Sequence, residues 1–400
     1  MADEEAALHT IDWTDLDTGR RWLSAESITF GLGLLGIGML FLYDRLYAHM
    51  YLVFDWRVDT LEWLFLLGLL LLLAFGVIPA LKRWNRTRIH LRRMMRRPST
   101  TFAMIFLGVL FVVGMLGPVL FEPPSIRFDH SYTPPVGLST DVNPLDCAGE
   151  ITGEPFDRTC HGTWDAVLGT NHRGMPIEYL LMSGARVALY VIVFTAAFVV
   201  PIGVATGIIA GLRGGLLDNL LMGYVDIQLS IPAIIVYFIA YTYWNVSLLL
   251  LLLTFGLLSW GGIARLVRSE VLQRREEGHV LVARGLGASS FYLARRHILP
   301  NVTNTVLPAA AHLLAILILV EAGVAFLGFH DIQEFSWGAT IAESTNSVFS
   351  PGLLKPEVTH LARDIWWAST FPALALGLTM LSFKLLGDGL RDSLDPRSNR

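Results

Sequence analysis

Apolar runs of roughly membrane-crossing length recur along the whole chain. A helix needs about 20 predominantly apolar residues to cross a bilayer. Six such runs predict spans over residues 27–43, 63–81, 101–121, 187–210, 303–327 and 365–386. The stretch 219–264 contains one charge, Asp226, and is too long for a single helix, so it predicts two more spans with a turn near residues 244–246. The pattern therefore predicts an all-α polytopic membrane protein with eight spans.

The composition agrees with this fold class. The 400 residues are 53% hydrophobic and 16% charged, whereas a soluble domain carries about 25% charged residues. The mean hydropathy is +0.53, and the net charge of −4 is too small to indicate a partner. The N-terminus is acidic and polar, unlike the basic start of a secretory signal peptide, so we expect the first apolar run to remain as an anchor.

Charge asymmetry between the loops predicts the orientation. Residues 82–97 hold eight Lys or Arg and no acid, and residues 265–300 hold seven Arg. Short basic loops stay in the cytoplasm, which with eight spans puts both termini inside and the loops 122–185 and 328–364 outside. We interpret 82–97 as an orientation signal.

Both cysteines, Cys147 and Cys160, fall in the external loop 122–185. A disulfide between them would stabilise the loop by roughly 3 kcal/mol in the chain-entropy model, and an external location permits it. Two free thiols are the alternative, and the sequence leaves both open.

The basic segment 270–301 has the pattern of a bent pair of helices. Glu270 and Arg274 form an i,i+4 pair that favours a helix, and the apolar residues Val280, Leu281, Ala283 and Leu286 follow on one stripe. Gly285 and Gly287 then interrupt it. Ser289 or Ser290 can cap a second helix, and Pro300 predicts a boundary before the next span. A compact bent pair is suited to docking in a groove of a soluble partner.

This segment resembles the cytoplasmic coupling loop of ABC importer permeases, the EAA loop. That pattern has Glu-Ala-Ala, a glycine four residues on, and an Ile/His-x-Leu-Pro ending. The residues that match it are Ala283, Gly287, His297, Leu299, Pro300 and Asn301. Leu281 and Val282 replace the glutamate and the first alanine. The resemblance implies that Ala283, Arg284, Gly285, Gly287, Ala288, His297, Leu299 and Pro300 couple the membrane domain to an ATPase.

Other stretches are similar to the second permease subunit of the dipeptide/oligopeptide/nickel importers. LGTNHRGMPIEYLLMSGARVAL (168–189) keeps Leu168, Gly169, Thr170, Gly174, Gly184, Ala185, Arg186 and Leu189, with Asn171, Met175, Pro176, Tyr179 and Leu180 in place of more polar family residues. RRMMRRPSTTFAMIFLGVL precedes it, and MGYVDIQLSIP (222–232), SWGGIARLVRSEVL (259–272), EAGVAFLGF (321–329), SWGATIAES (336–344) and LLGDGLRDSLDPR (385–397) follow in order.

The resemblance covers about residues 92–397. It implies a six-helix type I permease core over 98–400, with an external loop 122–185 and a coupling loop 270–301. Residues 1–97 are then an N-terminal extension with two transmembrane helices and a basic linker. The substitutions in 168–189 predict altered docking of a binding protein on that external stretch.

The implied assembly contains a sister permease, two ABC ATPases and an extracytoplasmic solute-binding protein in the cell membrane. No cofactor, metal or nucleic-acid partner is expected. The chain itself has no catalytic constellation: none of its lysines follows the glycine of a P-loop, and no histidine starts an HExxH motif. Peptides are the leading substrate class, with nickel complexes, glutathione-like molecules and oligosaccharides open.

Charged residues inside a membrane span are costly and are often functional. Asp226 and Glu321 are therefore pathway or gate candidates, with a boundary charge and a helix-pairing role as the respective alternatives. His312 is expected to be a packed interior residue. A secondary transporter, or a membrane protein of another class not driven by ATP, remains the alternative function. That alternative predicts paired half-helices in matching repeats, which the sequence does not show.

Overall fold

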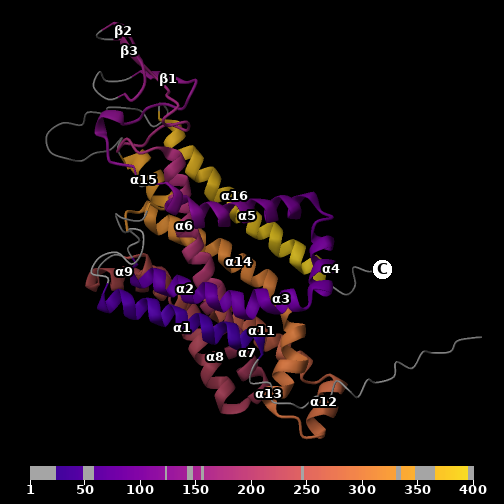
Figure 1. The fold of residues 1–400 in the computed structure, drawn as a ribbon. Coiled ribbons are helices and arrows are strands. Elements are labelled where there is room, and N and C mark those ends of the chain that lie inside the picture. The colour runs from indigo at the N-terminus through magenta and orange to yellow at the C-terminus, as the bar shows by residue number, and fades with distance from the viewer. Residues whose placement is uncertain are drawn as a thin grey trace, which may run out of the picture.

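A computed structural model describes residues 24–47, 58–121, 124–141, 147–154, 157–244, 247–329, 335–346 and 365–394 (Figure 1). Seven helical segments in these ranges are long and apolar enough to cross a membrane. An eighth is the pair α8 (Gly215–Ser230) and α9 (Ala233–Tyr243), which is bent by 77° at the break between them. The all-α, multi-spanning fold class is confirmed.

The spans are built from helices that in places run on through short π-helical turns. In chain order they are α1 (Ala25–Leu46); α2 (Thr60–Leu72), η2 (Leu73–Val77) and α3 (Ile78–Lys82); α5 (Pro98–Leu120); α6 (Ile177–Phe194), η4 (Thr195–Val199) and α7 (Val200–Arg213); α10 (Leu248–Leu258) and α11 (Gly261–Arg274); α14 (Leu299–Phe326); and α16 (Trp366–Leu394). The shorter helices are α4 (Trp84–Met94), α12 (Gly278–Gly285), α13 (Ser290–Leu293) and α15 (Trp337–Asn346).

The stretch 219–264 contains a further break before the expected turn near residues 244–246. The chain already breaks at Ile231 and Pro232, because proline cannot donate the helical backbone hydrogen bond. The second span starts at Leu248, where Ser247 caps the helix by accepting a bond from the Leu250 amide. The predicted turn at 244–246 lies between these helices, with 245 and 246 outside the described residues.

Glycines let α7 and α11 approach each other closely. Gly203, Gly207 and Gly211 follow at four-residue intervals on one face of α7. A methyl group added at Gly207 would lie 2.5 Å from the carbonyl oxygen of Ala264 on α11. Small residues at this spacing are the usual means by which membrane helices pack without a hydrophobic driving force between them.

The two ends of the bundle differ in character, as Figure 1 shows. One end carries a three-stranded antiparallel sheet of order β1-β3-β2, made of β1 (Ser139–Asp141), β2 (Ile151–Glu154) and β3 (Asp157–His161). The other end carries α12, α13 and α4. The segments 122–185 and 270–301 therefore lie at opposite ends of the bundle, as predicted.

The start of α1, the first described helix, and the end of α16, the last one, both lie at the α12 end of the bundle. Glu26, near the start of α1, pairs with Lys82 at a separation of 2.6 Å, and Lys82 lines a pocket together with Arg295. Near the end of α16, Asp392 pairs with Arg97. Residues 24 and 394 thus lie on the same side of the bundle.

α1 and α2 form a hairpin that packs sideways on α6 (Figure 1). The ring of Phe65 meets that of Tyr190 edge-on at 4.9 Å between centroids. The guanidinium of Arg186 donates to the Glu62 carboxylate at 3.0 Å and to the Tyr190 hydroxyl at 2.8 Å. α1 itself contributes no buried side chain, so α2 makes the contact with the rest of the protein.

The cysteine pair is joined. Cys147 and Cys160 form a disulfide with their Cα atoms 5.9 Å apart. Cys160 lies on β3 opposite Thr140 and is fully buried. The bridge therefore ties the loop after β1 to the central strand of the sheet.

Candidate coupling segment and membrane pathway

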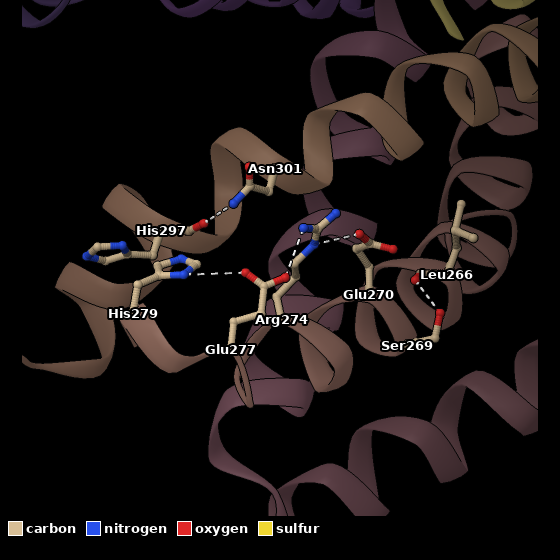
Figure 2. Close-up of polar contacts among 8 residues, drawn as sticks. All are labelled: Leu266, Ser269, Glu270, Arg274, Glu277, His279, His297 and Asn301. Carbon is tan, nitrogen blue, oxygen red and sulfur yellow. Dashed lines mark hydrogen bonds and ion pairs between the residues drawn. The ribbon is translucent and has the colours of Figure 1, made fainter. Parts of the chain in front are cut away.

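The segment 270–301 is anchored at its beginning by an arginine that bridges two carboxylates (Figure 2). Arg274, the last residue of α11, donates from Nε to Glu270 at 3.0 Å and from Nη1 to Glu277 at 2.9 Å. Arg275 donates to the carbonyl of Gly211 at the end of α7, at 3.0 Å. These bonds fix the direction in which the chain leaves the membrane helices and enters α12.

α12 ends in a tight left-handed turn centred on Gly287. The amide of Gly287 donates to the Arg284 carbonyl, and the amide of Ala288 donates to the Ala283 carbonyl, at 3.0 and 3.1 Å. This pair of bonds defines a Schellman motif, which requires a left-handed residue at the position of Gly287. Its φ is +86°, a value that costs a residue with a Cβ about 1–2 kcal/mol.

The second helix starts as the sequence predicts. The Ser289 hydroxyl accepts from the Tyr292 amide at 3.2 Å and caps α13. The expected boundary at Pro300 is wrong, because the chain passes from α13 through the π-helical turn η5 (Ala294–Ile298) directly into α14. Pro300 lies in the first turn of α14, directly after the π-helical turn, where the helical hydrogen-bond pattern changes.

Buried aliphatic side chains anchor the other end of the segment. Ile298 has no exposed surface and packs with Val267, Val271, Val302 and Val306 of α11 and α14. Val280 and Leu293 are also buried. The two helices are therefore held as one bent unit, joined to the bundle at both ends.

The outer surface of the bent unit is apolar and exposed. Leu286 is 84% exposed and Phe291 is 74% exposed. Leu281, Val282 and Tyr292 are exposed beside them. We call these five residues the tip. Covering one large apolar side chain is worth about 1.5–3 kcal/mol, so the tip is a strong candidate for contact with another protein.

The other predicted coupling residues surround the tip. Ala283 and Ala288 are half-buried at the bend, and Arg284, Gly285, Leu299 and Pro300 are exposed. The His297 ring is half-buried, with ring centroids 5.6 Å from His279 and 5.8 Å from Tyr292. Its backbone carbonyl accepts from the Asn301 side chain at 2.8 Å (Figure 2). The sequence-predicted set is thus one contiguous structural unit.

Asp226 has a partner that sequence reasoning missed. Its carboxylate pairs with Arg265, which joins α8 to α11. The two side chains are 64% and 54% exposed, so the pair lies on the outer surface of this chain. About two turns back along α8, Asp218 receives a bidentate contact from Arg268 at 2.5 and 2.7 Å. The sequence did contain a signal for this pairing. Two acidic residues on α8 and two arginines spaced three apart on α11 could have indicated that the two helices pack together.

Glu321 and His312 lie on different faces of α14. Glu321 is buried near the α15 end of that helix, close to Tyr237, whose hydroxyl donates to the Phe329 carbonyl at 3.0 Å. His312 is exposed, so the expectation of a packed interior histidine is wrong. A polar side chain that faces outward from a membrane helix needs protein or water around it.

The first part of the motif 168–189, before α6, folds into a tight turn against the helices at the sheet end. The Trp367 indole donates to the Thr170 carbonyl at 3.2 Å, and the Thr170 hydroxyl accepts from the Thr133 amide at 2.9 Å. Gly174 adopts a φ of +70°, and a Cβ there would lie 1.9 Å from the Arg127 carbonyl oxygen. Two of the retained motif residues, Thr170 and Gly174, therefore help to form the turn.

Three of the residues that depart from the family pattern are interior. Asn171, Met175 and Leu180 are buried, and the Asn171 side chain accepts from the amides of Arg173 and Met175 at 3.0 and 2.9 Å. These residues have no surface to offer a docked binding protein. They can influence docking only through the shape of the loop.

Among the described residues no group of three or more His, Cys, Asp or Glu is arranged to hold a metal ion.

Comparison with known proteins decides the family. Residues 203–400 match the profile of the binding-protein-dependent transport system inner membrane component. The oligopeptide transport system permease protein OppC of Salmonella typhimurium is 34% identical over 230 residues, which is 57% of this chain and 72% of that protein. The chain belongs to this permease family.

Two further relatives extend the match. The dipeptide transport system permease protein DppC of Bacillus subtilis is 30% identical over 237 residues, or 59% of this chain and 70% of that protein. OppC of the same organism is 29% identical over 305 residues, or 76% and 88%. The resemblance predicted from the motifs is confirmed. The protein is a multi-pass permease subunit of an ATP-driven importer and is not itself an enzyme, since ATP is hydrolysed by a separate subunit.

Proposed function

We propose that this permease subunit imports di- or oligopeptides together with a sister permease, and that the tip transmits the movement of ABC ATPase subunits to the membrane helices. The peptide class is supported by what the similar proteins are named to transport. The observation that carries the coupling role is the tip itself, an apolar surface on a bent unit fastened at both ends.

The anchoring of this unit makes it a mechanical link. Its first end is continuous with α11 and is tied to α7 through Arg275 and Gly211. Its second end continues into α14 through Ile298. A displacement of the tip by a docked ATPase would therefore move three membrane helices as rigid bodies, which is how packed helices switch between two arrangements. ATP must favour one of those arrangements for transport to be driven.

The translocation pathway is proposed to run along the exposed face of α8. An exposed ion pair within membrane-spanning helices is stable only where a protein or water surrounds it. Asp226 and Arg265 therefore face a sister permease or the aqueous pathway between the two subunits. Glu321, being buried, is proposed to brace the external end of α14 and α15 near the external gate.

The tip end of the bundle is proposed to face the cytoplasm, with both termini on that side. The density of Lys and Arg in residues 82–97 and 265–300 supports this orientation. The disulfide supports the opposite placement of the sheet end, because disulfides persist outside the cytosol. The sheet end is then available to a solute-binding protein.

We further propose that residues 1–97 are an extension added to a permease core of residues 98–400. The hairpin α1–α2 lies at the side of α6, whereas α5 to α16 pack together. The extension would stabilise α6 through α2.

The test is ATP-driven peptide uptake by proteoliposomes that contain the assembled transporter with its binding protein. Leu286→Asp combined with Phe291→Asp changes two exposed side chains, so the variant should insert normally and lose uptake. Ile89→Asp combined with Met95→Asp is the matched control, since both side chains are exposed at the same end of the bundle but lie outside the tip, and it should retain uptake. Uptake driven by an ion gradient without ATP would instead support a secondary transporter.

A further inference from the structure

A basic pocket lies at the tip end of the bundle, between the N-terminal extension and the root of the coupling segment. It has a volume of about 700 Å³. Four lining residues, Lys82, Arg83, Trp84 and Asn85, come from the junction of α3 and α4, and Arg295 and Arg296 come from η5. Segments more than 200 residues apart in sequence thus meet around one cavity.

The lining has the chemistry of a phosphate site. Four of its side chains are cations, one is an amide and one is an indole, and no lining residue is acidic. Lys82 already pairs with Glu26. When the charge of this carboxylate is included, the pocket still has a net charge of three positive units. Arg83, Arg295 and Arg296 are exposed and make no ion pair within the described ranges. Guanidinium groups bind phosphate oxygens through two parallel N–H donors.

The position of the pocket, at the end of a membrane span, points to a lipid ligand and not to a soluble anion. Lys82 is the last residue of the span Thr60–Lys82, and Pro300, which also lines the pocket, lies in the first turn of α14. Leu81 and Trp84 are exposed on either side of Lys82 and Arg83. Tryptophan next to cationic residues at the end of a span is typical of the headgroup layer. A pocket of this size accommodates a ligand of small-molecule dimensions.

We propose that this pocket binds the phosphate-bearing headgroup of an anionic phospholipid, which bridges the N-terminal extension to the coupling segment. Basic pockets between membrane helices on the cytoplasmic side recognise such headgroups. A bound phosphate would connect Arg83 beside α4 with Arg295 and Arg296 in η5, and η5 is the turn through which the tip joins α14. The effect of the lipid on coupling rests on the proposed function, whereas its binding does not.

The direct test is native mass spectrometry of the full transporter, extracted from nanodiscs of phosphatidylcholine with added phosphatidylglycerol. The triple variant Arg83→Gln, Arg295→Gln, Arg296→Gln removes three pocket cations and should retain phosphatidylglycerol on the order of a hundredfold more weakly. The matched control, Arg88→Gln, Arg92→Gln, Arg96→Gln, removes the same charge from exposed positions that do not line the pocket, and should retain the lipid as the unchanged protein does. Equal retention by all three proteins, or equal loss in both triple variants, would overturn the proposal.

Two further arms identify the source of the phosphate and separate this proposal from the coupling role. Inorganic phosphate and ATP are titrated onto detergent-solubilised protein by calorimetry; binding that disappears in the pocket variant would assign the site to a soluble anion and overturn the lipid assignment. The tip variant Leu286→Asp, Phe291→Asp should lose ATP-driven uptake and keep the lipid. Loss of the lipid in that variant would show that the pocket depends on tip docking, contrary to the proposal.

Discussion

The ion pair between Glu62 and Arg186 provides the sharpest test of how the N-terminal extension is attached. The two side chains are 14% and 20% exposed and lie between α2 and α6 within the membrane-spanning region. Glu62→Leu would remove the carboxylate and leave the largely buried guanidinium with the Tyr190 hydroxyl as its acceptor. Breaking a buried pair in this way costs about 3–5 kcal/mol, because one charge is left uncompensated.

A double-mutant cycle separates this cost from lost packing. Replacing both partners, as in Glu62→Leu with Arg186→Met, removes the charge imbalance and should return the free energy of unfolding to near its starting value. The coupling energy of the cycle should therefore be at least about 3 kcal/mol. The assay is equilibrium unfolding of the purified chain in mixed micelles.

The second ion pair of the hairpin is the control. Glu26 and Lys82 are solvent-accessible, so Glu26→Gln should change the unfolding free energy far less than Glu62→Leu does. The reasoning would be refuted if Glu62→Leu cost less than about 1 kcal/mol, the value expected of an exposed pair.

Three more predictions follow from the described geometry. Gly287→Trp should insert normally, lose about 1–2 kcal/mol of stability through left-handed backbone strain, and lose transport-stimulated ATPase activity. The control Gly285→Ala lies in helical backbone with open space around it and should keep that activity. Wild-type stimulation in Gly287→Trp would contradict the docking role of the bend. Cys147→Ser with Cys160→Ser should destabilise the sheet-end loop by roughly 3 kcal/mol, which limited proteolysis would detect as faster cleavage between β1 and β3. The unchanged protein treated with reductant should be cleaved at the same rate as this variant. Equal proteolysis with and without the disulfide would count against the stabilising role. Burial, with the neighbouring Arg173 charge, lowers the pKa of His172 from 6.5 to about 4. The unfolded chain therefore binds a proton first as the pH falls, and the stability of the folded chain should decrease between pH 6.5 and 4. His172→Gln should flatten the dependence of melting temperature on pH over that range, and an unchanged slope would show that another group causes it.

Much of the fold could be predicted because each span satisfies its own backbone hydrogen bonds and is apolar over its length. The bend at Gly287 and the cap at Ser289 were also readable, since both are local rules of helix ends. The break at Ile231 and Pro232 was missed because the whole stretch is uniformly apolar, and hydropathy alone does not locate a kink.

Features that depend on distant contacts could not be predicted from the sequence. The interpretation of residues 82–97 as an orientation signal stays a prediction, and it did not include the pocket, because Lys82 and Arg83 meet Arg295 and Arg296 only in the folded chain. The pairing of Asp226 with Arg265 likewise requires the packing of α8 against α11. A hydropathy pattern also does not reveal which face of α14 is left open, and this is why the exposure of His312 was not foreseen.

The most direct test of the central claim is maleimide labelling of a cysteine placed on the tip. Both native cysteines are held in the disulfide, so Leu286→Cys provides a single reactive thiol, and Trp164→Cys provides one at the opposite end. In inverted membrane vesicles, Cys at position 286 should label in the permease alone and be protected when the ATPase subunits are bound, while Cys at position 164 should label only from the other side of the membrane. Labelling of position 286 that is unaffected by the ATPases, or that occurs from the same side as position 164, would contradict the account.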